Sequence, residues 1–243
     1  MPSYRVVKES TLRACLSAIV DIAKSQQLDQ LVQDSTGLKS GHPSVSPHIL
    51  RLSHSFPFVG GSWDVPSSLD LIIYHLPEKL YAVSLCETYF TRVIWYSDIV
   101  SMDELNEDIL GPVYTYMEAV NSRQDQPYAE NVEALPISPH RLAILFFVLA
   151  IGSLVDINLP LGSTQAEDYF ELGKACLALT DVFVMPELGT LQALFLAHLY
   201  YHHGSPRYSP EAAWSIMGLC VRLVHTVSVH ASLLDLHSTH PYL

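Results

Sequence analysis

The chain has 243 residues and is acidic, with 13 basic and 25 acidic residues and a formal net charge of −12. Hydrophobic residues make up 49% of it and charged residues only 16%, a composition that excludes extensive disorder and allows a sizeable buried core. An acidic surface repels phosphates, so the chain by itself is predicted to be a poor nucleic-acid binder.

The cysteines give no sign of a metal site. Cys15, Cys86, Cys176 and Cys220 are widely spaced, and no two of them form a Cys-x-x-Cys pair. This spacing argues against a zinc site or a disulfide framework and favours a reducing intracellular compartment. The N-terminus MPSYRVVKES has no apolar signal-peptide core, so secretion is not expected. We expect no cofactor in this chain.

The first 47 residues are predicted to be a helix and a linker. Residues 9–34 place apolar side chains at three-to-four spacing, which is typical of an amphipathic helix. The following STGLKSGHPSVSP breaks that pattern and indicates an exposed linker. Residues 56–63, with two consecutive glycines, are expected to be irregular.

Three further helices are predicted before the middle of the chain. A short one is expected at 67–75, and Pro77 can open the next, at 78–97, in its first turn. Ser101–Glu104 fits a capping box for a third helix. An interruption of that helix is predicted at Gly111-Pro112, because proline disturbs the preceding turn.

Four helices with clear start signals fill the second half. Each begins at a proline, at an N-cap serine followed by proline, or at a capping box. The expected helices run from Ser138-Pro139 to Asp156, from the Thr164–Glu167 box to Leu179, from Pro186 to Gly204, and from Ser209-Pro210 to about Val229. Short loops favour antiparallel packing and no strand pattern competes, so the predicted fold is all-α, a multi-helix bundle of about seven to nine helices.

The most apolar stretch is HRLAILFFVLAIGSLVD, which runs from His140 to Asp156. Its uncharged part, between Arg141 and Asp156, is 14 residues long. A membrane-spanning helix needs about 20 apolar residues. The stretch is therefore predicted to be a helix buried in the protein, and no membrane association is expected.

No catalytic pattern is present. His198 and His202 are four residues apart, a spacing that could share a metal ion, but no third ligand accompanies them. No GxSxG, P-loop or GxGxxG pattern occurs, so the chain is not expected to be an enzyme. The alternative is a small helical enzyme with an unidentified cofactor in a pocket lined by these histidines, Tyr200 and Tyr201.

Two features of the predicted helices leave structural questions open. Gly152, Gly173 and Gly218 lie inside helices, where close helix approach or a kink would explain them. Arg141 lies in a first turn, where the helix dipole disfavours a cation, so a carboxylate partner elsewhere in the fold is predicted.

Five sequence blocks between residues 70 and 230 occur in a characteristic order. They are Leu76-Pro77 with Tyr89-Phe90 and Val93–Trp95; His140–Leu145 with Ala150–Leu154 and Asp156; Ala166 with Tyr169-Phe170 and Ala175; Gly189–Leu194 with Tyr200; and Ala213-Trp214 with Gly218, Val221–Leu223 and Val229-His230. In order and spacing, residues 70–230 resemble the fungal-specific transcription factor domain, the middle regulatory region of fungal zinc-cluster transcription factors.

The resemblance implies boundaries and a set of motif positions. Residues 48–230 correspond to the regulatory domain, and 231–243 to a divergent tail. The family's glycine is replaced by Ser228 and its Arg-Asp by Ala231-Ser232. The family's domain usually continues well past this block, whereas only SLLDLHSTHPYL follows here, so the domain is expected to be truncated. The motif positions, with structural roles, are His140, Arg141, Gly152, Asp156, Gln192, Trp214, Gly218, Arg222 and His230.

The function implied by the resemblance is transcription regulation in the nucleus, with response to a small-molecule effector in some members. The family reads DNA through a six-cysteine zinc cluster, which is absent here, so zinc and DNA would bind only through that missing module. A protein partner or self-association is expected. The alternative is an interaction module that dimerises with full-length relatives.

The last predicted helix carries two expectations. Trp214 is expected to be buried, so that its replacement by alanine would cost about 3–5 kcal/mol. The final SLLDLHSTHPYL is expected to form no more than a weak helical turn or two. An exposed apolar patch is therefore predicted between Met217 and Val229, causing self-association or partner binding.

Overall fold

A computed structural model describes residues 45–58, 63–93, 99–125, 138–159, 163–184, 186–202 and 209–239. Across these ranges every regular element is a helix, so the all-α prediction is confirmed. The helices are α2 (Pro47–Ser55), α3 (Val65–Ile73), α4 (Lys79–Arg92), the π-helical η1 (Glu104–Leu110), α5 (Gly111–Asp125), α6 (Pro139–Val155), α7 (Gln165–Ala178), α8 (Leu188–His202) and α9 (Pro210–Thr239). They belong to one compact unit, Ser44–Leu243. The predicted helix at 9–34 lies outside the described residues.

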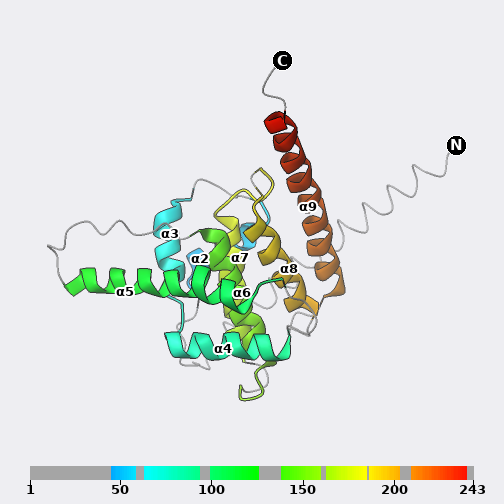
Figure 1. The fold of residues 1–243 in the computed structure, drawn as a ribbon. Coiled ribbons are helices and arrows are strands. Elements are labelled where there is room, and N and C mark those ends of the chain that lie inside the picture. The colour runs from blue at the N-terminus through cyan, green and yellow to red at the C-terminus, as the bar shows by residue number, and fades with distance from the viewer. Residues whose placement is uncertain are drawn as a thin grey trace. The chain divides into compact units, whose positions relative to one another are not determined.

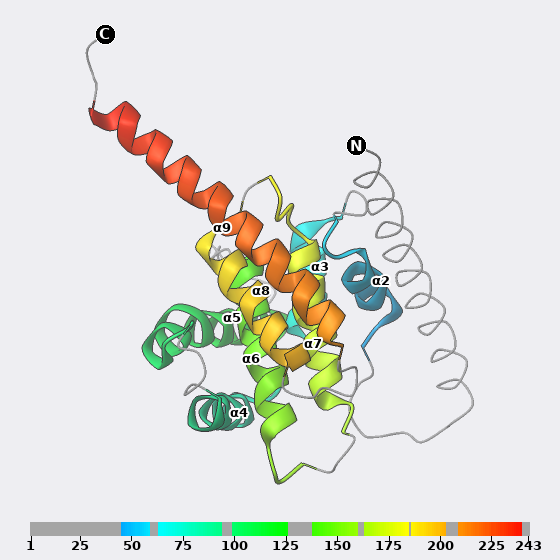
Figure 2. The same ribbon diagram turned by 90° about the vertical axis from the view of Figure 1, so that its right-hand side faces the viewer.

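Helix α6 is the centre of this unit. Figures 1 and 2 place it among α4, α7 and α8, and it contacts all three. Ser138 is its N-cap and Pro139 its first residue, as the sequence predicts. All residues from Leu142 to Ile151 are buried, so the helix is enclosed on every side, and the core-helix prediction is confirmed. None of the described helices combines the length and apolar character that a membrane span requires.

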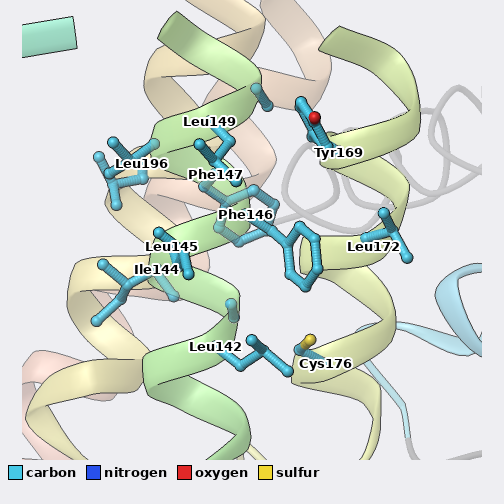
Figure 3. Close-up of a cluster of buried hydrophobic side chains, with 14 of the residues drawn as sticks. Leu142, Ile144, Leu145, Phe146, Phe147, Leu149, Tyr169, Leu172, Cys176 and Leu196 are labelled. Atoms are coloured by element: carbon cyan, nitrogen blue, oxygen red, sulfur yellow. The ribbon is translucent and has the colours of Figure 1, made fainter. Parts of the chain in front are cut away.

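Aromatic side chains fill the space between α6, α7 and α8. Figure 3 shows Phe146 and Phe147 of α6 near Tyr169 and Leu172 of α7. The Phe147 ring lies 5.3 Å from the ring of Phe170, which in turn stacks on Tyr200 of α8 at 4.1 Å. Because stacked and edge-on rings add to the free energy of apolar burial, this chain of rings fixes how the three helices pack.

The helical glycines separate into two kinds. A Cβ atom on Gly152 would overlap the backbone carbonyl of Leu85 in α4, and one on Gly173 would lie 2.6–2.9 Å from the Phe147 ring. A Cβ on Gly218 would meet nothing within 4 Å. Close approach therefore explains the first two glycines, and Gly218 makes no such contact.

Several helix ends differ from the prediction. Gly111-Pro112 does not interrupt a helix but begins α5, directly after the π-helical turns of η1. Thr164 is the N-cap of α7, yet its side chain makes no capping hydrogen bond, so the predicted capping box does not form. Instead, the N–H of Gln165 donates to Ser163 Oγ at 3.4 Å.

Helix α9 corrects two predictions. It runs to Thr239, so the segment expected to form a weak turn or two continues the helix, and Figures 1 and 2 show this part extending past α8. Trp214, expected in the core, is 76% exposed. The side that packs on α8 carries smaller residues, Ala213, Cys220 and Leu223, which are buried.

Candidate functional site

Three of the nine motif residues meet at one cavity. His140, Arg141 and Gln192 line a cavity of about 470 Å³ formed by η1, the start of α5, the start of α6 and the start of α8. Its floor is apolar, with Ile109, Val113 and Ile144 buried beneath it. A partly enclosed space with an apolar floor and a few converging polar groups has the character of a small-molecule site.

The other motif residues lie elsewhere. Asp156 caps the end of α6, where its Oδ1 accepts hydrogen bonds from the N–H and the Nδ2 of Asn158, both at 2.9 Å. Gly152 contacts α4, whereas Gly218 and Arg222 are on the exposed side of α9. The side chain of His230 lies outside the described residues. Asp156, Gly152, Gly218 and Arg222 are not part of the cavity lining.

His140 is held in the cavity wall by α8. Its ring is 5% exposed, and Nδ1 lies 3.1 Å from Oγ1 of Thr190, which is fully buried. The same Oγ1 accepts the N–H of Glu187 at 3.1 Å, so its own proton needs an acceptor, and Nδ1 of His140 is the one it has among the described residues. This hydrogen-bond arrangement assigns the proton of the imidazole to Nε2.

Gln192 joins α8 to η1. Its Nε2 donates to the carbonyl of Ile99 at 3.1 Å and to Oε1 of Glu104 at 2.9 Å. Both amide protons are therefore used, while Oε1 of Gln192 has no partner among the described residues although the side chain is only 7% exposed. Because Gln192 belongs to the cavity lining, this oxygen is suited to accept a hydrogen bond from a bound molecule.

Arg141 has a different partner from the one predicted. Its Nη1 donates to the backbone carbonyl of Asp108 at 2.9 Å, not to a carboxylate. Asp108 belongs to the π-helical η1, in which backbone pairing runs over five residues, as in the hydrogen bond from the Gly111 N–H to the carbonyl of Asn106. The hydrogen bond from Arg141 to Asp108 ties η1 to the start of α6.

The imidazole of His140 gives the site a dependence on pH. Burial lowers its pKa below the ordinary 6.5, and the nearby Glu187 partly opposes this shift. As the pH falls, the unfolded chain takes up this proton before the folded protein does. The contribution of the neutral, buried His140 to the free energy of unfolding is therefore fully present above pH 6.5 and is lost as the pH drops toward the folded-state pKa. Burial of His75 contributes in the same direction.

We predict that His140→Gln reduces the loss of stability on acidification below pH 6.5, because Gln cannot be protonated there. Urea unfolding at a series of pH values measures the slope of unfolding free energy against pH for both proteins. His75→Gln is the matched control for the other histidine. Equal slopes in wild type and His140→Gln would contradict the assignment of a depressed pKa to His140.

The histidine pair suggested by the sequence is engaged in packing. His198 donates from Nδ1 to the carbonyl of Ala213 at 3.0 Å, which ties α8 to α9, and its ring lies 6.0 Å from that of His202. Tyr200 is buried against Phe170, so it does not line an open pocket. Within the described ranges, no three His, Cys, Asp or Glu side chains are grouped so that they could hold a metal ion.

Sequence reasoning missed Thr190, Glu104 and Glu187. Thr190 lies 50 positions from His140, and Glu104 lies 88 positions from Gln192. The sequence signal that could have found Thr190 is its place in the first turn of a predicted helix, where a hydroxyl accepts hydrogen bonds from backbone N–H groups.

Comparisons of the chain with protein-family models, with curated proteins and with solved structures found no match.

Proposed function

We propose that this chain is the regulatory region of a fungal transcription factor of the zinc-cluster type, acting in the nucleus, and that the cavity is its effector site. The observation that carries the proposal is the meeting of His140 and Arg141 from one motif block with Gln192 from another. The all-α fold agrees with it. Oε1 of Gln192, which has no protein partner among the described residues, leaves an acceptor in the cavity lining for a bound molecule.

The arrangement around the cavity suits a regulatory role. Arg141 and Gln192 each make a hydrogen bond to η1 or the residues before it, so three chain segments meet at the same polar groups. A ligand shifts a protein between states only by contacting them differently. A molecule that competes for these side chains would loosen or tighten η1 against α6 and α8.

The proposal is tested by a transcription reporter. The chain is placed between an unrelated DNA-binding module and a constitutive activation segment, with an inert helical spacer of equal length as control. We expect reporter output to differ from the control by about fivefold or more, the lower range of usual coupling between sites. Equal output from both fusions, at equal protein level and nuclear content, would refute the regulatory role.

We predict that the chain alone does not bind duplex DNA in a sequence-selective way. Its charge of −12 cannot neutralise phosphates, and a zinc cluster is not present to read a groove. Gel-shift titrations at near-physiological salt, with random and selected duplexes, measure this. A shifted band that survives an excess of random competitor would show that the prediction is wrong.

A second candidate function is self-association through α9. Trp214, Val221 and Val224 are exposed at helical spacing, which forms an apolar stripe along the side turned away from α8. Large exposed apolar patches mark interaction surfaces. The stripe overlaps the region from Met217 to Val229 where an exposed patch was expected, and it also includes Trp214.

We predict that Trp214→Ala changes the free energy of unfolding by no more than about 0.5 kcal/mol, as for other surface positions, and weakens self-association. Urea denaturation measures the first effect, and light scattering after size exclusion across a dilution series measures the second. Leu223→Ala, on the buried side of α9, is the control that should destabilise. A wild-type chain that is monomeric at every concentration would remove this second candidate.

A further inference from the structure

We propose that the cavity lined by His140 and Gln192 binds a small organic cation, an aliphatic primary amine that also carries a hydroxyl or carbonyl acceptor. This inference rests on the effector site proposed above and specifies the chemistry of its ligand. The carboxylates around the cavity favour a positive charge on the ligand. The N–H of the His140 imidazole favours a hydrogen-bond acceptor on it.

The charge around the cavity is negative. Three carboxylates, on Glu104, Asp108 and Glu187, line it together with a single cation, Arg141. The guanidinium is already turned to the carbonyl of Asp108, and Oε1 of Glu104 already accepts from Gln192. The second oxygen of Glu104 has no donor among the described residues, so it can accept from an ammonium group. Charge-assisted hydrogen bonds of this kind are the strong ones.

Two polar atoms on largely buried side chains of the cavity lining, with no protein partner among the described residues, give the second reason for a ligand. Oε1 of Gln192 has no donor among the described residues, and its neighbour Glu104 lies on the same side of the cavity. Nε2 of His140, which carries the proton, has no acceptor among them either. An amine offers three donors to the carbonyl and the carboxylate. A hydroxyl or carbonyl oxygen a few bonds away would accept a hydrogen bond from the Nε2–H of the imidazole.

The apolar floor of the cavity determines the chemistry of the part of the ligand that joins its two polar ends. Ile109, Val113 and Ile144 are buried and offer no hydrogen bonds, so a short methylene chain fits between the two polar ends. Gly189 brings α8 against α6, since a Cβ there would lie 3.2 Å from the Cβ of His140. This close approach keeps the imidazole and the amide of Gln192 on one wall.

The inference is tested with three probes of equal length: aminobutanol, butanediol and hydroxybutyrate. Binding to the full chain is measured by isothermal titration and by amide chemical-shift changes around the cavity. We expect saturable binding of aminobutanol, and binding at least about tenfold weaker for butanediol, which lacks the charged donor. Hydroxybutyrate binding as tightly as aminobutanol would overturn the proposal.

Variants separate the site from general charge attraction. Glu104→Gln should weaken aminobutanol binding by about tenfold, and Asp108→Asn should weaken it in the same direction while leaving the backbone carbonyl that Arg141 uses. Glu87→Gln removes one exposed charge on α4, away from the cavity, and should change nothing. Helical circular dichroism and the denaturation midpoint check that each variant is folded.

The outcomes distinguish this inference from the function on which it rests. Equal weakening by Glu104→Gln and Glu87→Gln, or no saturable binding of aminobutanol, overturns the amine class. The reporter fusion needs no added ligand, so an altered output there would still support the regulatory role.

Discussion

Alanine in place of Gly152 is expected to lower the free energy of unfolding by about 3 kcal/mol, the upper range for overpacking a core. The added methyl would overlap the backbone carbonyl of Leu85 in α4. A backbone group cannot rotate away as a side chain does, so α4 as a whole must move from α6. The gain in helix propensity, about 1 kcal/mol, is smaller than this cost.

Gly218→Ala is the matched control for that experiment. It is also a mid-helix glycine, but its Cβ would meet nothing within 4 Å. Only the propensity term remains, and the variant should be more stable by about 0.4–1 kcal/mol. Urea denaturation of wild type and the two variants measures these changes in the free energy of unfolding. A destabilisation by Gly152→Ala no larger than about 0.5 kcal/mol would mean that α4 and α6 do not pack this closely.

The core of the fold could be predicted from local sequence. The uncharged stretch between Arg141 and Asp156 is apolar on every side of a helix, which predicts that α6 is enclosed by the protein. The starts of α6 and α9 followed from serine followed by proline, and in α9 the N–H of Ala212 does donate to Ser209 Oγ at 3.1 Å. Such signals lie within one helical turn.

The face of α9 could not be predicted, because two apolar stripes compete on it. One carries Ala213, Cys220 and Leu223, and the other carries Trp214 and Val221. Periodicity shows both, and it predicts burial of the stripe with the larger side chains. The fold buries the smaller residues, because α8 approaches closely enough for Cys220 Sγ to lie 3.9 Å from the carbonyl of Leu191.

The candidate site was predictable only in part, for a similar reason. His140, Arg141 and Gln192 were singled out as motif residues with structural roles, but nothing local placed them around one cavity. Their partners are set by tertiary packing and by the π-helical turns of η1. Those turns depend on how the residues before Pro112 distribute their carbonyls, which the sequence pattern does not specify.

Phe147→Ala is expected to cost about 3–5 kcal/mol, as is usual when a large aromatic side chain is removed from a core. The ring is fully buried and lies against Phe170, which links α6 to the stack with Tyr200. Its removal leaves a cavity between α6 and α7 that the neighbouring helices cannot fill.

The same ring explains Gly173, and this gives the sharpest test of the packing. Alone, Gly173→Ala should cost about 1–3 kcal/mol, because its Cβ would lie 2.6–2.9 Å from a ring that has no free space into which to move. In the Phe147→Ala background the obstacle is gone, so the second alanine should be neutral or stabilising by up to about 1 kcal/mol. A double-mutant cycle on unfolding free energies therefore predicts strong non-additivity between these two positions. Additive effects would mean that α7 does not rest on Phe147, and the arrangement of α6, α7 and α8 around the aromatic stack would have to be different.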